Sequence, residues 1–270
     1  MNKLFLLAIL PLIISCNSNS QATCTIPEPL KLEFTKAVES IDYSEDDFYE
    51  INSLLFDYEF KDSLRGLKDC NFYKNGIKKL FDSENIYKKT TAYRLIGTCQ
   101  DSAFNEEMIK RLNSDEESIA KQWNATALMS NRANESAEPI FNLFLNDNGI
   151  ALNILINMYV KYDTLNVKRT AKNHLNDTNR EAQILAVQCL ASYGQNEELI
   201  LKLREFVQVW DLNSKGWAIS ALSMQKAGDL KDLLEPFMVN EGLVNVITRA
   251  LENSPTEADR DFAKEIEKKN

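Results

Sequence analysis

Glycine and proline are scarce in this sequence, with 8 and 6 copies among 270 residues. A domain built from many tight β-hairpins needs both residues at its turns, so this composition disfavours an all-β fold. Apolar residues make up 44% of the chain and charged residues 26%, which is sufficient for a buried core and atypical of disorder. We therefore predict an all-α fold.

The usual signatures of catalysis and of metal binding are also missing. The chain has one histidine, His174, and its five cysteines form no CxxC pair. It has no Gly-x-Ser-x-Gly sequence and no glycine-rich phosphate loop. His174 lies at the predicted end of a helix, where a positive charge interacts favourably with carbonyl groups, so we interpret it as structural. The sequence predicts a non-enzymatic protein without catalytic residues, metal or cofactor.

Basic residues are outnumbered, since 31 lysines and arginines stand against 40 aspartates and glutamates, for a net charge of −9. Nucleic acid binding requires a basic surface, so nucleic acid is excluded as a partner. Between Glu28 and Glu59 there are ten acidic residues against two lysines. We interpret residues 29–57 as two acidic helices, 30–41 and 45–56, that cap the N-terminal end of the fold.

Long apolar runs are absent except at the N-terminus, where Leu4–Ile14 is interrupted only by Pro11. Eleven helical residues rise about 17 Å, which is too short to span a bilayer, so residues 1–15 are predicted to be a signal peptide. The end of this segment, Ile13-Ile14-Ser15-Cys16, resembles the lipobox of bacterial lipoproteins, in which a small residue precedes a cysteine that is acylated.

That resemblance implies that Cys16 is lipidated and becomes the first residue of the mature protein, with residues 16–28 as a flexible tether. It implies a location in the bacterial cell envelope, where a lipid anchor holds the protein on the outer membrane, facing the periplasm or the surface. The alternative is an ordinary secretory signal followed by an unrelated cysteine.

A short sequence motif recurs at the ends of predicted helices, as in Leu145-Asn146-Asp147 and Leu175-Asn176-Asp177. Its leucines are spaced by 32, 33, 30 and 37 residues, counted from Leu80 to Leu212. Each copy of this motif precedes apolar residues at helical spacing. This pattern predicts a repeated helix-turn-helix unit in which Asn, Asp or Ser begins the next helix. The predicted first helices are 84–97, 116–130, 150–161, 180–193 and 215–226. The predicted second helices are 104–112, 138–145, 166–175, 197–209 and 230–238.

The first helices combine small and large apolar residues, such as Ala92 with Leu95 and Ala125 with Leu128. Together with the period of about 33 residues and the Ala137-Glu138-Pro139-Ile140 start of a second helix, this pattern resembles HEAT-like repeats of the short bacterial type. The resemblance implies a right-handed α-solenoid of about six to seven stacked helical hairpins over residues 58–252. The tetratricopeptide and ankyrin signatures are absent.

The C-terminal residues 253–270 are predicted to cap this array. Ser254-Pro255-Thr256-Glu257 is interpreted as a capping box with proline at the first helical position. Ala258, Phe262 and Ile266 then give the last helix a narrow apolar stripe, which suits an element that covers the final repeat.

HEAT-like arrays commonly bind proteins, so the resemblance implies a non-catalytic scaffold for an unidentified envelope or surface protein. Two alternatives stay open: a glycan-active envelope hydrolase with paired carboxylates, and an immunity-type inhibitor whose acidic end covers a basic toxin. The candidate partner-binding residues are Lys168, Arg169 and Lys172, because residues 161–180 are the one basic run and these cations share a side of a helix. Second helices of HEAT-like arrays usually line the concave surface, so an acidic partner is expected there. The alternative is a solvated face.

Three further sets of residues are interpreted from their surroundings in the sequence. Trp210 and Trp217 are either anchors for a partner or core residues. Cys189 lies in an apolar helix and is predicted to be a buried free thiol. Cys70 and Cys99 either form a disulfide bridge or remain separate, because their spacing alone does not decide the pairing.

Overall fold

The computed structural model describes residues 27–60, 71–113, 117–146, 152–162 and 164–269. These residues form 15 α-helices and a few short 3₁₀ helices, and no β-strand occurs among them, so the predicted all-α fold is confirmed. The helices are α1 (Glu28–Glu39), α2 (Glu45–Phe60), α4 (Asn71–Phe81), α5 (Ile86–Cys99), α6 (Asn105–Leu112), α7 (Ser118–Ser130), α8 (Ala137–Asn146), α9 (Leu152–Tyr162), α10 (Thr164–His174), α11 (Arg180–Ala191), α12 (Glu197–Val209), α13 (Leu212–Met224), α14 (Lys231–Leu234), α15 (Glu241–Glu252) and α16 (Glu257–Lys269).

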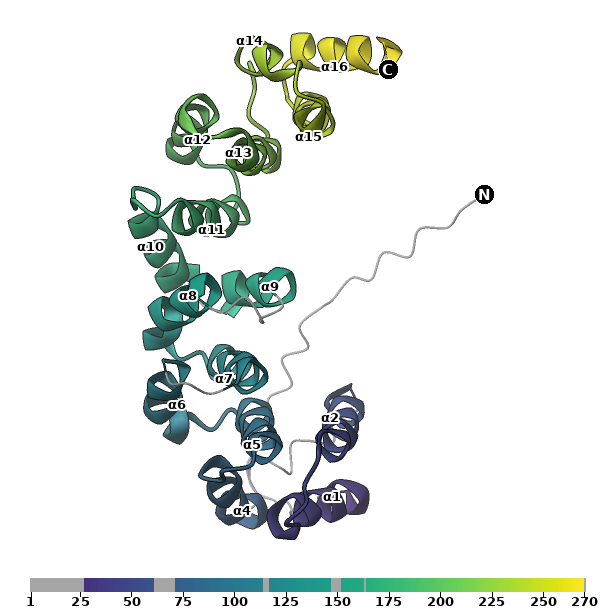
Figure 1. The fold of residues 1–270 in the computed structure, drawn as a ribbon, viewed down its shortest axis with the longest axis vertical. Helices are drawn as coiled ribbons and strands as arrows, with labels where there is room; N and C mark the ends of the chain where they lie inside the picture. The colour runs from purple at the N-terminus through teal and green to yellow at the C-terminus, as the bar shows by residue number, and fades with distance from the viewer. Residues whose placement is uncertain (1–26, 61–70, 114–116, 147–151, 163, 270) are drawn as a thin grey trace, which may run out of the picture.

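The helices lie in two rows along an arc (Figure 1). The predicted first helices form the inner, concave row with α15, and within this row α5 packs on α7, α7 on α9, α11 on α13, and α13 on α15. The predicted second helices form the outer row, where α6 packs on α8 and α8 on α10. The expectation that second helices line the concave surface is therefore wrong, because in this arc they lie on its convex side.

Small residues on the inner row give a physical reason for this curvature. Ala125 and Ala127 on α7 are buried, as are Ala182 and Ala186 on α11. At Gly97 on α5, an added Cβ would lie 2.9 Å from the Cα of Ala127. Small side chains let neighbouring helices approach closely, so the inner row is the shorter of the two and the stack bends toward it.

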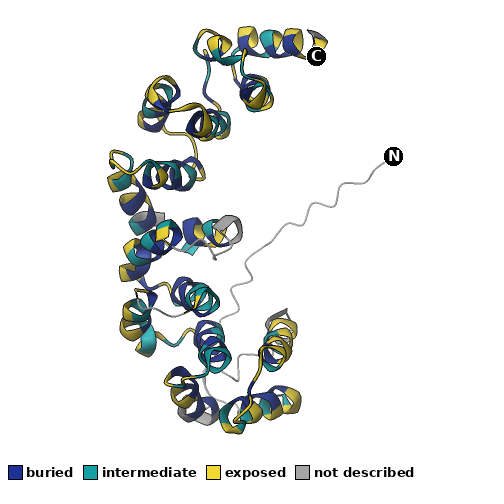
Figure 2. Ribbon diagram, in the orientation of Figure 1, coloured by how far each residue is buried: buried dark blue, intermediate teal, exposed yellow. Residues whose placement is uncertain are grey.

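Buried residues occur along the whole arc instead of around a single centre (Figure 2). Each helix turns its apolar positions toward its neighbours, as the 3.6-residue periodicity predicts.

Cys189 is buried in α11, and burial raises the pKa of its thiol to about 12, so the predicted buried free thiol is confirmed. Cys99 is buried at the end of α5, whereas Cys70 lies outside the described residues, so their pairing stays a prediction.

Asn and Asp side chains begin several helices. The Oδ1 atom of Asn85 accepts hydrogen bonds from the backbone N–H groups of Tyr87 and Lys88 at the start of α5. Asn179 does the same for α11, and Asp211 accepts from Ser214 N–H at the start of α13. These side chains satisfy helix N–H groups that have no partner within their own helix. Asn and Asp do begin these helices, but none of the three belongs to the recurrent motif, and the copy Leu212-Asn213-Ser214 lies in the first turn of α13 instead of at the end of a helix.

At the N-terminal end, α2 packs on α1 and α5 and lies toward the concave side of the arc (Figure 1). Lys36 of α1 holds these acidic helices together, because its Nζ atom lies 2.7 Å from Asp47 Oδ1 and 3.6 Å from Glu50 Oε2. The hydrogen bond from Lys36 lowers the pKa of Asp47 to about 2. None of the described helices is both long and apolar enough to cross a membrane.

The capping box predicted before the last helix is wrong in detail. Helix α16 begins at Glu257, so Pro255 precedes the helix and does not occupy its first turn. Ser254 Oγ donates to Asp259 Oδ2 at 2.6 Å, and Asp259 takes the place expected of Glu257. Helix α15 was not predicted from the sequence; it begins at Glu241, and the side chain of Asn240, just before it, accepts from Gly242 N–H.

Candidate functional site

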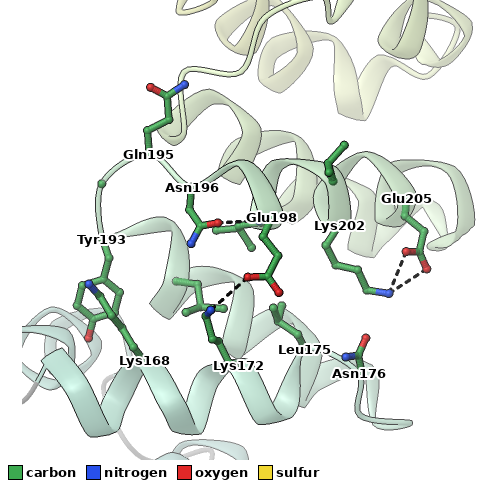
Figure 3. Close-up of a pocket in the computed structure, with 14 residues that line it drawn as sticks. Lys168, Lys172, Leu175, Asn176, Tyr193, Gln195, Asn196, Glu198, Lys202 and Glu205 are labelled. Carbon is green, nitrogen blue, oxygen red and sulfur yellow. Dashed lines mark hydrogen bonds and ion pairs between the residues drawn. The ribbon is translucent and has the colours of Figure 1, made fainter.

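A groove of about 630 Å³ lies between α10 and α12 on the outer row (Figure 3). These two helices approach each other less closely than α8 and α10 do, which leaves space between neighbouring repeats. Leucines of α11 and α12 and one in the turn after α10 contribute to its lining, and Leu201 exposes 68% of its surface. The apolar lining residues are Leu175, Leu190, Leu199 and Leu201.

Two of the three predicted binding residues line this groove. Lys168 and Lys172 are four residues apart on α10, so both project from the same face, Lys168 toward Tyr193 after α11 and Lys172 toward Glu198 of α12 (Figure 3). Arg169 does not line the groove, and its Nη2 atom donates to Asn166 Oδ1 at 2.8 Å. One residue along a helix corresponds to a rotation of about 100°, which explains why Arg169 is separated from its neighbour.

Each groove lysine has a different contact. Lys172 Nζ lies 3.2 Å from Glu198 Oε2, whereas Lys168 Nζ lies 4.5 Å from the centre of the Tyr193 ring. Lys202 Nζ lies 2.9 Å from Glu205 Oε2 on the same helix. Among the described residues, no carboxylate lies within 4.0 Å of Lys168, so none of these carboxylates neutralises its ammonium group.

The turn between α11 and α12 forms one side of the groove and is held rigidly. Asn196 Oδ1 accepts from Leu199 N–H and begins α12. Gln225, buried at the end of α13, accepts from Asn196 N–H at 2.8 Å. Its Nε2 atom donates to the carbonyl oxygens of Ala191 and Gly194. Sequence reasoning missed Gln225, because a single glutamine carries no motif and resembles any surface residue.

His174 is the last residue of α10 and joins it to its neighbours through two carboxylates and an aromatic ring. Its Nε2 atom lies 2.8 Å from Glu138 Oε1, its Nδ1 atom lies 3.0 Å from Asp177 Oδ2, and its ring stacks on Phe141. Burial lowers the pKa of His174, but the hydrogen bonds to the two carboxylates outweigh this effect and raise the pKa above its usual value. Both ring nitrogens of His174 therefore have a carboxylate partner.

The two tryptophans have different environments. Trp210 is buried, stacks on Phe206, and lies under the guanidinium of Arg180 at 4.7 Å. Trp217 exposes 46% of its surface and lines a second hollow of about 520 Å³ between α13 and α15. Trp210 is therefore a core residue, and Trp217 remains available to a partner.

No group of three His, Cys, Asp or Glu side chains that would suit a metal occurs in the described part of the chain. Cys16, the predicted lipidation residue, lies outside the described residues together with the apolar segment before it. In comparisons with known proteins, no family model, no curated protein and no solved structure matches the chain. The interpretation of the groove therefore depends on its own chemistry.

Proposed function

We propose that the protein is a lipid-anchored scaffold of the bacterial cell envelope that binds another envelope or surface protein without catalysing a reaction. The groove between α10 and α12 is the observation that carries this proposal, because it combines exposed leucine with lysine at a junction between repeats. Pockets of this size that place apolar side chains beside charged and polar ones are typical of binding sites.

The fold belongs to the same proposal. Two rows of helices and a sequence period near 33 residues support a right-handed HEAT-like α-solenoid of about six to seven hairpins. The lipobox-like Ile13-Ile14-Ser15-Cys16 supports acylation of Cys16 and attachment of the array to a membrane. A tether between the anchor and the first helix would let the array reach partners near the membrane.

A glycan hydrolase has less support. The two glutamates that line the groove, Glu198 and Glu205, come from one helix, and each lies close to a lysine. Paired catalytic carboxylates act from opposite sides of a glycosidic bond, with one of them protonated. This arrangement in the groove favours binding over hydrolysis.

An immunity-type inhibitor of a basic toxin is a second candidate, and α2 favours it. Along one side this helix exposes acidic residues together with two aromatic rings, a combination that suits a basic protein surface. The exposed residues are Asp46, Tyr49, Glu50, Phe56 and Asp57.

The anchor is tested with Cys16→Ala. We expect the variant to leave the membrane fraction and to keep its helical circular dichroism, because the lipid alone holds the protein on the membrane. A variant that still sediments with membranes contradicts the lipoprotein proposal.

The scaffold is tested by capture of proteins from solubilised envelopes, followed by mass spectrometry. The wild-type chain is compared with the double variant Lys168→Glu, Lys172→Glu. The matched control is Lys78→Glu, Lys79→Glu, which makes the same charge change at exposed positions of α4. We expect one partner to be captured by the wild type and the control and lost from the groove variant. A partner that all three chains retain, or none at all, overturns the proposed site.

A further inference from the structure

The ion pair between Lys172 and Glu198 spans the groove from α10 to α12, and it is exposed to solvent. The side chain of Glu198 is 82% exposed and that of Lys172 is 51% exposed. Ion pairs in such positions contribute little to stability, because water solvates both charges when the pair opens. Another carboxylate can therefore replace Glu198 on Lys172 at small cost to the fold.

Lys168 supplies a second point for an anionic group. Its ammonium group lies over the Tyr193 ring at 4.5 Å, and no described carboxylate lies within ion-pair distance of it. A contact with an aromatic face orients the lysine and leaves its three N–H donors available. Lys168 and Lys172 thus mark two positions, one turn of α10 apart, where carboxylates would fit.

The groove also offers apolar surface next to these charges. Leu201 of α12 is 68% exposed, and Leu175, Leu190 and Leu199 contribute to the same lining. Leu175 is half-buried, whereas Leu190 and Leu199 are buried, so Leu201 supplies most of the exposed apolar surface. An exposed leucine gains free energy when a partner's apolar side chain covers it. A volume of about 630 Å³ accommodates a few side chains and is too small for a broad protein face.

From these contacts we infer that the groove binds a short peptide segment of the partner that carries carboxylates next to large apolar side chains, and that Glu198 is an internal competitor for its carboxylate. This inference rests on the proposed scaffold function. The partner's carboxylates bind Lys168 and Lys172, Glu198 moves out into solvent, and an apolar side chain of the segment covers Leu201.

A polyphosphate, or the headgroup of an anionic lipid whose acyl chains stay in the bilayer, would use the lysines but not the leucines. The net charge of −9 also opposes a long polyanion, because the rest of the surface would repel it. A short segment with few charges avoids that repulsion, and its apolar side chains use the leucines. The chemistry of the groove therefore favours a peptide.

The test begins with a random library of 12-residue peptides displayed on phage, selected on the detergent-solubilised full-length protein. We expect the enriched peptides to combine Asp or Glu with Leu, Ile or Phe. The strongest peptide is then synthesised with a fluorescent label, and its affinity is measured by anisotropy at low and high salt. Two peptide variants, one with its acids amidated and one with its apolar residues changed to serine, separate the two contributions.

Protein variants then locate the peptide. We expect Lys168→Glu with Lys172→Glu to weaken binding at least about tenfold, with a smaller loss at high salt, since screening reduces the charge contribution. Leu201→Ser should weaken binding at either salt concentration. Glu198→Gln should strengthen binding by about threefold, because Lys172 no longer has a competing carboxylate. The control Lys78→Glu, Lys79→Glu should change nothing, and circular dichroism confirms that each variant is folded.

The inference is overturned if no peptide is enriched, if the enriched peptides lack acidic residues, or if Glu198→Gln leaves the affinity unchanged or weaker. Binding of phosphatidylglycerol vesicles with the same dependence on Lys168 and Lys172, without peptide binding, overturns it in favour of a lipid. If binding of the envelope partner depends on the groove lysines but no peptide binds, the peptide inference is wrong and the scaffold proposal still holds. If binding of the partner does not depend on the groove lysines either, both proposals are wrong.

Discussion

His174 and Glu138 connect two consecutive helices of the outer row, with His174 Nε2 of α10 lying 2.8 Å from Glu138 Oε1 of α8. Asp177 contacts the other ring nitrogen, and Phe141 stacks on the ring at 4.3 Å between centres. A protonated histidine donates to both carboxylates, whereas a neutral one can donate to only one. The junction between these repeats is therefore sensitive to pH.

The first prediction concerns the pH dependence of stability. Because the two carboxylates raise the pKa of His174, the folded protein binds this proton more tightly than the unfolded chain, in which histidine titrates near about pH 6.5. The stabilisation is fully present below that pH and is lost as the pH rises through the raised pKa of the folded state. Urea unfolding of the wild type and His174→Gln, from about pH 5.5 to about pH 9, should show a difference that shrinks with increasing pH.

The single histidine makes a direct control simple, because the ring protons of His174 are the only histidine signals in the NMR spectrum. Glu138→Gln should lower the measured pKa of His174, since it removes one of the two carboxylates. A pKa that does not move, or a stability difference that is constant with pH, contradicts this account of the junction.

The second prediction concerns Asp259, a buried carboxylate on α16. Its oxygens accept from the backbone N–H groups of Leu230 and Lys231, at 2.8–3.0 Å, and from Ser254 Oγ. Asp259→Asn replaces an acceptor with a donor, leaves a buried N–H without a partner, and should lower the free energy of unfolding by about 1–3 kcal/mol. Chemical denaturation measures the loss.

Asp261→Asn is the matched control, because Asp261 lies two residues along the same helix and its side chain is 57% exposed. We expect no measurable loss from that change. Equal stabilities of the two variants would mean that the contacts of Asp259 do not hold the C-terminal helix in place.

The third prediction concerns Lys215, which is buried at the junction of α12 and α13. Its Nζ atom donates to the carbonyl oxygens of Val207, Gln208 and Trp210 at the end of α12. Burial lowers the pKa of Lys215, because it disfavours the charged form. The ammonium group nevertheless stabilises the end of α12, since it supplies hydrogen bonds to carbonyl groups that have no partner within the helix. Lys215→Met should destabilise the protein by about 1–3 kcal/mol, whereas Lys226→Met at an exposed position should not. If the Lys215→Met variant is as stable as the wild type, water must hydrogen-bond these carbonyl groups in place of the ammonium group.

These residues also show how far the sequence determines the structure. The apolar periodicity of α12 predicts its bounds, 197–209, because the pattern and its Asn196 cap are local features. The sequence pattern predicts Lys215 as the first residue of a helix, yet α13 begins at Leu212 and packing buries the lysine. Burial depends on contacts with another helix, which a local pattern does not contain.

In the candidate site, too, local features could be predicted from the sequence and contacts between helices could not. The spacing of Lys168 and Lys172 predicts a shared face, and the structure places both on one groove. The curvature of the arc was not predictable, because it depends on how closely helices of neighbouring repeats approach. The roles of Glu198 and Gln225 also depend on contacts across that junction. The lipidation of Cys16 stays a prediction from its motif.

The last prediction uses two glycines in helices of the inner row. An alanine at Gly216 of α13 would place its Cβ 3.7 Å from Leu243 Cδ2, an ordinary contact. At Gly97 of α5, the same Cβ would lie 2.9 Å from the backbone Cα of Ala127 on α7. Gly216→Ala should stabilise the protein by up to about 1 kcal/mol, because alanine is the better helix former.

Gly97→Ala gains the same helix propensity but must push α5 and α7 apart, and overpacking of this kind costs about 1–3 kcal/mol. The clash is with backbone, which cannot rotate away as a side chain can, so we expect a net loss of stability. Urea denaturation of the two variants under identical conditions should therefore give changes of opposite sign. If both variants are stabilised, α5 and α7 lie farther apart than the structure places them, and close packing of the inner row no longer explains the curvature of the arc.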